Sequence, residues 1–145
     1  MSELNNQNAV LIIGGGHSGV SAALEITEAV DKKVYIIEKN SYIGGRVLQM
    51  YKYFPKLCPP FCGFEINTRR IKSSAEGNIN ILVSSKVEEI TKSKNGFGYN
   101  VKIKQKPQYI NDNCTVCGEC AKVCPEERPN AFNYDMDNTR AIFMP

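Results

Sequence analysis

The sequence has no tryptophan, only one histidine and no long apolar run. A transmembrane helix needs about 20 consecutive apolar residues, whereas the apolar run at residues 10–13 is far shorter. The amino terminus also lacks the basic and apolar stretches of a secretory signal peptide. We therefore expect a cytoplasmic protein without a transmembrane segment of its own.

Charge of one sign is not in large excess either. The chain has 18 Lys and Arg against 15 Asp and Glu, a formal net charge of +3, which is too small to indicate binding to nucleic acid or to a membrane. We expect no nucleic-acid partner. Hydrophobic residues make up 42% and charged residues 23% of the chain, as in folded globular proteins. Its 145 residues are enough for one ordinary domain and a small additional one.

Six cysteines are present, and in a secreted protein they could form three disulfides. The missing export signal argues against disulfides, and so does the spacing of the cysteines, which is typical of metal ligands. We therefore expect reduced thiols in a reducing, oxygen-poor cytoplasm.

The first part of the chain has the pattern of a β-α-β unit. Residues 9–13 form a continuous apolar run that ends at glycines, which predicts a buried parallel strand. Apolar residues then recur at helical spacing from residue 18 to about residue 30, where Asp31 is expected to end the helix. Residues 33–38 predict the second strand. This order indicates an α/β fold of the Rossmann type, with the two strands side by side.

The turn of this unit carries a dinucleotide-binding pattern. Gly14, Gly16 and Gly19 have the spacing G-x-G-x-x-G between the predicted strand and helix, and Glu38 ends the second strand. Gly14 permits a tight turn, Gly16 lets a pyrophosphate approach the backbone, and Gly19 allows the helix to pack closely. The helix N-terminus attracts phosphate, and Glu38 can accept hydrogen bonds from a ribose diol. His17 is interpreted as a turn residue, and the sequence offers no convincing catalytic acid or base.

Farther along the chain the pattern changes twice. A short helix is expected at residues 64–71, a strand at 79–83, and a β-hairpin from 86–94 and 97–103 around an Asn95-Gly96 turn. The composition changes again at residue 106, where a cysteine-rich tail begins. The predicted domains are therefore a dinucleotide fold at residues 1–105 and an iron–sulfur segment at residues 106–145.

The tail contains the cysteine run of bacterial ferredoxins. Cys114, Cys117, Cys120 and Cys124 have the spacing C-x-x-C-x-x-C-x-x-x-C, and Pro125 follows. This run predicts ligands of a [4Fe–4S] cluster and a ferredoxin-like segment. Zinc is the competing interpretation, but structural zinc sites usually place two cysteine pairs farther apart.

The fourth ligand stays open, because in two-cluster ferredoxins the last cysteine of the run binds the other cluster. Cys58 and Cys62 are the other thiols of the chain. They could join Cys124 at a second site, or one of them could complete the first cluster. The remaining alternative is a redox-active or simply buried pair.

Two resemblances refine this interpretation. The glycine turn, Glu38-Lys39 and the segment Gly44-Gly45-Arg46 together resemble the N-terminal signature of the glutathione-reductase-like FAD proteins, in which the second glycine pair continues the wall of the FAD site. The resemblance favours FAD over a nicotinamide cofactor. The alternative is that Gly44-Gly45 is only a loop.

Taken together, the motifs resemble the A-subunit of heterodisulfide reductase, and still more the A-subunit of the quinone-interacting membrane-bound oxidoreductase. The stretches that carry the resemblance are residues 44–47, 53–67, 114–125, 128–133 and 140–142. The resemblance implies FAD in a thioredoxin-reductase-like domain, with Gly14, Gly16, Gly19, Glu38, Lys39 and residues 44–46 at the flavin. It also implies that the cysteines bind [4Fe–4S] clusters.

The same resemblance implies the role of the chain. Electrons would pass between FAD and iron–sulfur clusters toward partner subunits, through which the complex could also touch a membrane. Members of the family continue well past position 145, so we expect a fragment or a small subunit whose FAD domain is completed by another chain. The alternative is a flavin-free subunit that relays electrons through clusters or serves as a scaffold.

Overall fold

The computed structural model describes residues 8–30, 32–73, 78–94, 96–111 and 113–143. The chain divides into two compact units, Met1–Pro107 and Gln108–Pro145. Asp31, expected to end the first helix, and Asn95, expected in the hairpin turn, lie outside the described residues. In the part of the chain that is described, no helix is long and apolar enough to cross a membrane.

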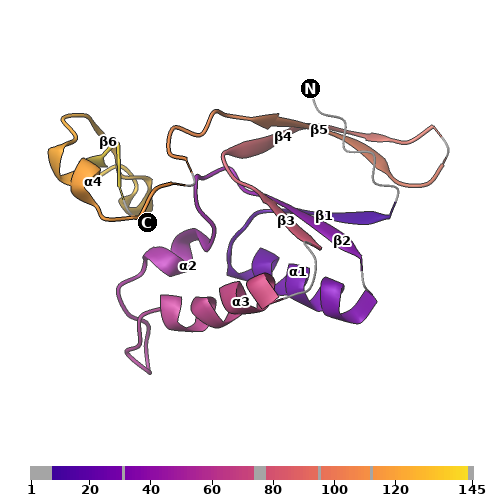
Figure 1. Ribbon diagram of the computed structural model, residues 1–145, viewed down its shortest axis with the longest axis horizontal. Helices are drawn as coiled ribbons and strands as arrows, with labels where there is room; N and C mark the ends of the chain where they lie inside the picture. The colour runs from indigo at the N-terminus through magenta and orange to yellow at the C-terminus, as the bar shows by residue number, and fades with distance from the viewer. Residues whose placement is uncertain (1–7, 31, 74–77, 95, 112, 144–145) are drawn as a thin grey trace. The chain divides into compact units, whose positions relative to one another are not determined.

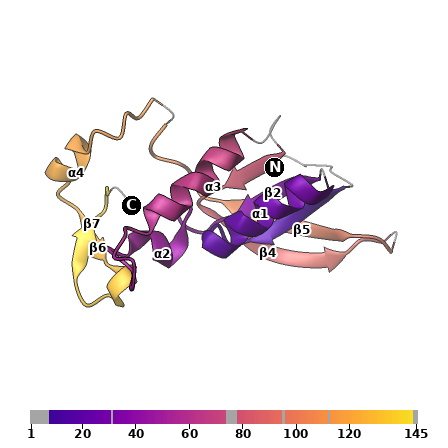
Figure 2. The same ribbon diagram turned by 90° about the horizontal axis from the view of Figure 1, so that it is seen from below.

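The first unit is built around a parallel sheet of β1 (Ala9–Ile13), β2 (Lys33–Ile37) and β3 (Ile79–Leu82), in the order β1-β2-β3. Ile12 lies opposite Ile36, and Ile36 lies opposite Ile81. The helices α1 (His17–Val30) and α3 (Phe61–Ser73) cover one face of this sheet, and the hairpin of β4 (Ser85–Lys92) and β5 (Tyr99–Gln105) lies on its other side (Figure 1, Figure 2). The predicted α/β, Rossmann-like architecture is confirmed.

The core lies between α1 and the sheet. Val20, Ala23 and Leu24 are fully buried, as are Val34 and Ile36 of β2. The α1 residues recur at helical spacing, whereas the β2 residues alternate, so each element presents its apolar side chains to the same interior. The sequence periodicity therefore predicted both elements correctly.

Helix α3 extends the core and is longer than the predicted 64–71 segment. Phe64 is 5% exposed and belongs to the core cluster, and the Asn67 side chain donates to the Ser21 hydroxyl at 3.3 Å. The helix begins earlier than predicted because it follows Pro59 and Pro60: the N–H groups of Cys62 and Phe64 bond to their carbonyls at 3.1 and 3.4 Å. Proline suits the beginning of a helix, because its missing N–H would have no helical partner there.

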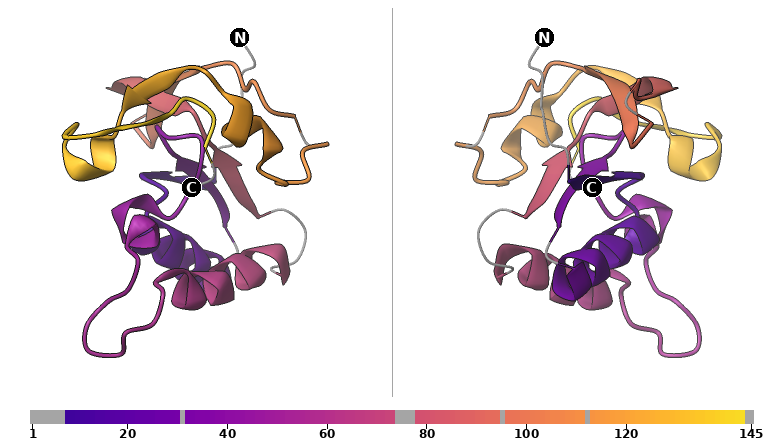
Figure 3. Two further views of the ribbon diagram at one scale, coloured as in Figure 1. Left: turned by 90° about the vertical axis from the view of Figure 1, so that its left-hand side faces the viewer. Right: turned by 90° about the vertical axis from the view of Figure 1, so that its right-hand side faces the viewer.

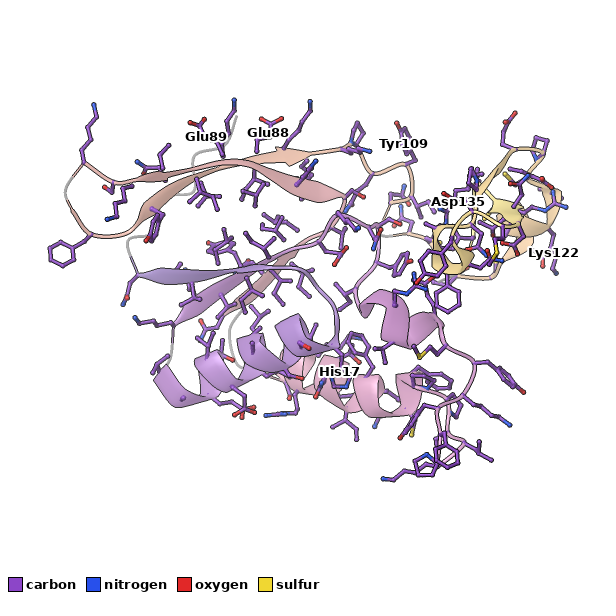
Figure 4. The ribbon with its side chains drawn as sticks, turned by 180° about the vertical axis from the view of Figure 1, so that it is seen from behind. His17, Glu88, Glu89, Tyr109, Lys122 and Asp135 are labelled. Atoms are coloured by element: carbon purple, nitrogen blue, oxygen red, sulfur yellow. The ribbon has the colours of Figure 1, made fainter. Side chains whose placement is uncertain are left out.

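The hairpin is present as predicted, with shifted bounds. Its register changes between Val87 and Glu89, so Glu88 is an extra residue in β4. The Glu88 carboxylate lies 3.6 Å from the Lys102 ammonium and 3.8 Å from that of Lys104. A bulge of this kind bends a strand and increases its twist. Figure 4 shows Glu88 and Glu89 on the hairpin.

A short helix, α2 (Gly45–Gln49), was not predicted. It follows Gly44, whose φ of 107° lies in the left-handed region, and the Met50 N–H closes it on the Val47 carbonyl at 3.2 Å. A single helical turn shows no sustained apolar period, so the sequence pattern could not indicate it.

The second unit contains α4 (Glu119–Val123), β6 (Glu127–Pro129), the 3₁₀ turn η2 (Ala131–Asn133) and β7 (Asn138–Arg140). Strands β6 and β7 are antiparallel, with Arg128 opposite Thr139. The Arg140 guanidinium donates to the Cys124 carbonyl, and the Arg128 guanidinium lies 4.3 Å from the centre of the Phe143 ring. These contacts hold the β-ribbon beside the end of the cysteine run.

Candidate functional site

The glycine-rich turn joins β1 to α1 at the carboxyl end of the sheet. Gly14 has a φ of 110°, a conformation that favours glycine, and its N–H bonds to the Ile37 carbonyl at 2.8 Å. The first helical hydrogen bond follows at once, from the Val20 N–H to the Gly16 carbonyl at 3.0 Å. The turn therefore presents the N-terminus of a 14-residue helix, where N–H groups and the helix dipole favour an anion.

Gly16 and Gly19 differ in the space available to a side chain. A Cβ on Gly19 would lie 2.0 Å from the Gly14 carbonyl oxygen, whereas a Cβ on Gly16 would have no heavy atom within 4 Å. Gly19 therefore lets the helix approach the turn, because no side chain fits between them. At Gly16 the backbone borders open space, and a ligand phosphate could reach it there.

Glu38 lies buried behind the turn, only 5% exposed. One carboxylate oxygen accepts the Gly15 N–H at 2.7 Å, and the other accepts the Asn40 N–H at 2.8 Å. Each oxygen keeps a further lone pair, so the carboxylate can still accept hydrogen bonds from a ribose diol. The predicted acid thus sits against the predicted glycine turn.

Sequence reasoning did not single out Gly15, which fills an unspecified position of the G-x-G-x-x-G pattern. A Cβ there would lie 3.0 Å from the Ile43 side chain and 3.2 Å from the Glu38 Cβ. The one available signal was the run of three glycines at residues 14–16. Gly15 is the residue that allows Glu38 to approach the turn.

The second glycine pair packs against the same turn. The Gly44 N–H donates to the Gly15 carbonyl at 2.7 Å, and Gly16 and Gly44 form a parallel β-bridge. A Cβ on Gly45 would lie 3.2 Å from the Gly16 Cα. Gly44-Gly45 therefore packs directly against the glycine turn, and its contact with a cofactor stays a prediction. Arg46 is exposed in α2, and Lys39 is exposed beside Glu38.

These groups suit a dinucleotide. The N-terminus of α1 lies next to Gly16, which has no side chain and borders open space, and a buried carboxylate lies at the end of β2. Those features correspond to the pyrophosphate and ribose contacts of a Rossmann-type site. The residues present therefore fit a nucleotide cofactor.

His17 is the first residue of α1, as Figure 4 shows. Its Nδ1 lies 3.4 Å from the Ser21 hydroxyl, and its ring centre lies 6.2 Å from that of Phe64. The two contacts tie the start of α1 to α3, and neither involves a carboxylate that would orient the ring as a catalytic base.

The cysteine run of the second unit is mostly exposed. Cys114, Cys117 and Cys120 are exposed, whereas Cys124 is 7% exposed. The backbone N–H of Glu119 and, more weakly, the Thr115 hydroxyl hydrogen-bond to Cys117 and lower the pKa of its thiol. Donors of this kind favour a thiolate, which is the form that binds metal.

The described residues do not gather these thiols into a metal site. Across residues 8–143 apart from the gaps given above, no three Cys, His, Asp or Glu side chains come close enough to hold a metal ion. Cys58 is half-buried opposite Tyr53, and Cys62 is exposed in the first turn of α3, both in the first unit. The chemistry of the thiols suits a cluster, but their placement does not form one.

Comparison with known proteins agrees with the geometry of the turn. Residues 12–53 match the family model described as an NAD(P)-binding Rossmann-like domain. A solved structure, L-proline dehydrogenase from P. horikoshii, aligns over 72% of this chain and 21% of its own, with 17% identity and a TM-score of 0.49. That structural likeness is too weak to support an inference.

The curated relatives are more informative. The A-subunit of the H(2):CoB-CoM heterodisulfide, ferredoxin reductase of Methanothermobacter marburgensis is 34% identical over 99% of this chain and 21% of its own length. The iron-sulfur A-subunit of the CoB–CoM heterodisulfide reductase of Methanocaldococcus jannaschii is 38% identical over 93% of this chain and 20% of its own. The chain thus spans about one fifth of the length of these relatives. Over nearly all of its residues, this chain belongs to the A-subunit family of heterodisulfide reductase.

Proposed function

We propose that this chain is an electron-transfer part of a heterodisulfide-reductase-like oxidoreductase that carries FAD and [4Fe–4S] clusters. The observation that carries the proposal is the packing of two glycine segments, residues 14–19 and 44–45, against each other with Glu38 buried behind them. A surface of this kind accommodates a dinucleotide pyrophosphate. Flavin at this surface would supply the conversion between two-electron and one-electron chemistry.

The residues of the chain would bind and orient that dinucleotide. The α1 N-terminus would hold the pyrophosphate, and Gly16 would allow its close approach to the backbone. Glu38 would accept hydrogen bonds from the ribose hydroxyls. The contact of Gly44 with Gly15 supports FAD over a nicotinamide cofactor, because it places the second glycine pair of the glutathione-reductase-like signature at the turn. Arg46 and Lys39 belong to the proposed site through that same signature.

The iron–sulfur part of the proposal is supported by cysteine spacing and by the name of a relative. Cys114, Cys117, Cys120 and Cys124 have ferredoxin spacing, and the Methanocaldococcus relative is an iron-sulfur subunit. The thiols do not converge in the described residues, so their assignment to clusters rests on spacing and not on geometry. Cys58 and Cys62 remain candidate ligands.

Partners are proposed on the same basis. The relatives are subunits by name and about five times longer than this chain. Among the described residues, β1 pairs with β2 alone, so its other edge has backbone N–H and C=O groups that a further strand could pair with. We therefore propose other subunits of such a complex as partners, including a chain that completes the sheet and the FAD site.

The decisive experiment is anaerobic purification followed by an ultraviolet–visible spectrum and quantification of FAD, iron and acid-labile sulfide. Flavin bands together with a broad iron–sulfur shoulder would support the proposal. Iron and sulfide without flavin would favour the alternative, a flavin-free relay or scaffold subunit. Neither cofactor after anaerobic reconstitution would refute both.

The role of the first-unit cysteines needs its own test. Iron and sulfide would be counted in Cys58→Ala and Cys62→Ala variants, with Cys114→Ala as the reference for loss of a ligand from the run. A lower count in either first-unit variant would support ligation. Unchanged counts in both would show that the pair binds no cluster.

A further inference from the structure

Residues 50–61 run from the end of α2 to the first residue of α3. They form a loop that projects from the helices of the first unit (Figure 3). Its tip is held by its own backbone bonds: the Leu57 N–H donates to the Tyr53 carbonyl at 2.8 Å, and the Tyr53 N–H donates to the Cys58 carbonyl at 3.3 Å. A β-bridge joins Tyr53 and Cys58. We call residues 50–61 the projecting loop.

Large apolar side chains cover this loop and point into solvent. Phe54 is 87% exposed, Tyr51 is 84% exposed and Leu57 is 62% exposed. Single exposed apolar residues are common on protein surfaces, but a contiguous group of them usually marks a binding surface. The tip therefore presents apolar area that contact with a partner would remove from water.

The charged residues of the projecting loop have one sign. Residues 50–61 contain Lys52 and Lys56 and no acidic residue. The Lys52 ammonium lies 5.1 Å from the centre of the Tyr51 ring. A partner with negative charge complements this loop.

The residue types favour a lipid surface over a protein. The centres of protein interfaces are enriched in arginine and depleted in lysine, whereas both cations of the projecting loop are lysines. Lysine beside aromatic residues is typical of the membrane interface, where the ammonium stays among the headgroups while its stem is buried.

We propose that the projecting loop binds the surface of an anionic lipid bilayer. Phe54 and Leu57 enter the boundary between headgroups and acyl chains, and Lys52 and Lys56 contact the lipid phosphates. This binding does not use the dinucleotide site, and the vesicle experiments below measure it separately from the contents of flavin, iron and sulfide. It is also a property of this chain itself and requires no other polypeptide.

The absence of tryptophan from the chain allows a direct test. Phe54→Trp places a single fluorescent reporter at the tip, and Phe97→Trp places a matched reporter in the β4–β5 turn, where Phe97 is 90% exposed. Both proteins would be mixed with vesicles of phosphatidylcholine alone and with vesicles that also contain phosphatidylglycerol. We expect a blue shift for Phe54→Trp with the anionic vesicles and none for Phe97→Trp.

Three outcomes would overturn the proposal. They are no shift at position 54, an equal shift at both positions, and a shift at position 54 that depends on protein concentration without vesicles. The second would indicate unspecific apolar adhesion, and the third would indicate a protein partner, namely a second copy of the chain.

The charge contribution has a separate readout. In vesicle sedimentation, Lys52→Gln/Lys56→Gln should weaken binding by about 30-fold, from the usual contribution of a lysine near an anionic surface. The control is Lys92→Gln/Lys94→Gln, which removes two exposed lysines of the hairpin and should bind like the unmodified chain. Equal weakening in both pairs would refute a specific role of the loop.

Discussion

Gly19→Ala is the substitution that most directly tests how α1 packs on the glycine turn. The new Cβ would lie 2.0 Å from the Gly14 carbonyl oxygen and 3.2 Å from the Gly14 carbonyl carbon. Backbone atoms cannot rotate away as a flexible side chain can. The helix or the turn must therefore move by more than about 1 Å to restore ordinary contact distances.

That movement has a cost that can be bounded. Val20, Ala23 and Leu24 of the same helix are fully buried, so displacing α1 also loosens the core. Overpacking of a well-packed interior costs about 1–3 kcal/mol, and a rigid backbone obstacle puts Gly19→Ala at or above the upper end. The higher helix propensity of alanine offsets about 1 kcal/mol of this loss. The net loss in the free energy of unfolding should be about 2 kcal/mol or more.

Gly63→Ala is the matched control, because Gly63 is also helical but a Cβ there meets no heavy atom within 4 Å. This variant should gain up to about 1 kcal/mol from helix propensity alone. Urea unfolding followed by far-ultraviolet circular dichroism would measure both variants, since the chain has no tryptophan to report by fluorescence. A Gly19→Ala variant as stable as Gly63→Ala would refute the packing argument.

Three further predictions concern the turn and the second unit. Gly16→Ala should keep the stability of the unmodified chain, because its Cβ meets open space. The same Cβ would occupy the place where the pyrophosphate approaches the backbone, so isothermal titration should show ADP binding at least about tenfold weaker. Unchanged ADP binding would contradict the assignment of this surface. Glu38→Gln should lower the free energy of unfolding by about 1–3 kcal/mol, because an amide cannot accept both N–H groups that the carboxylate accepts; urea unfolding without loss would show that these bonds contribute little. Arg140→Ala should remove the bond to the Cys124 carbonyl and speed amide hydrogen exchange in β6 and β7 while leaving β2 unchanged; equal exchange in both proteins would show that the guanidinium does not hold the ribbon.

The three glycines of the turn have separate structural roles. Gly14, Gly16 and Gly19 each act through a different physical property: a left-handed conformation, an open border and a close approach. Replacing any of them by alanine therefore has a different expected consequence. The two reporters, stability and nucleotide affinity, separate these consequences from one another.

Local sequence patterns are enough to specify the β-α-β unit. The apolar run of β1 and the helical spacing of Val20, Ala23 and Leu24 indicate their elements without knowledge of the rest of the fold. The candidate residues Gly14, Gly16, Gly19 and Glu38 could be predicted for the same reason, because the motif lies within one continuous unit. The cysteine run likewise predicts a cluster from spacing alone, and this remains a prediction.

How the segments meet depends on the tertiary structure. The Glu38 carboxylate reaches the Gly15 N–H across 23 positions of sequence, and Gly44 bonds to Gly15 from a segment that could equally have been a simple loop. Because glycine has no side chain, the sequence contains no apolar or polar pattern that would predict such a contact. The extent of α3, the single turn of α2 and the exposure of the projecting loop have the same origin. Each depends on packing between residues that are distant in the sequence, and the local hydrophobic periodicity does not reveal such packing.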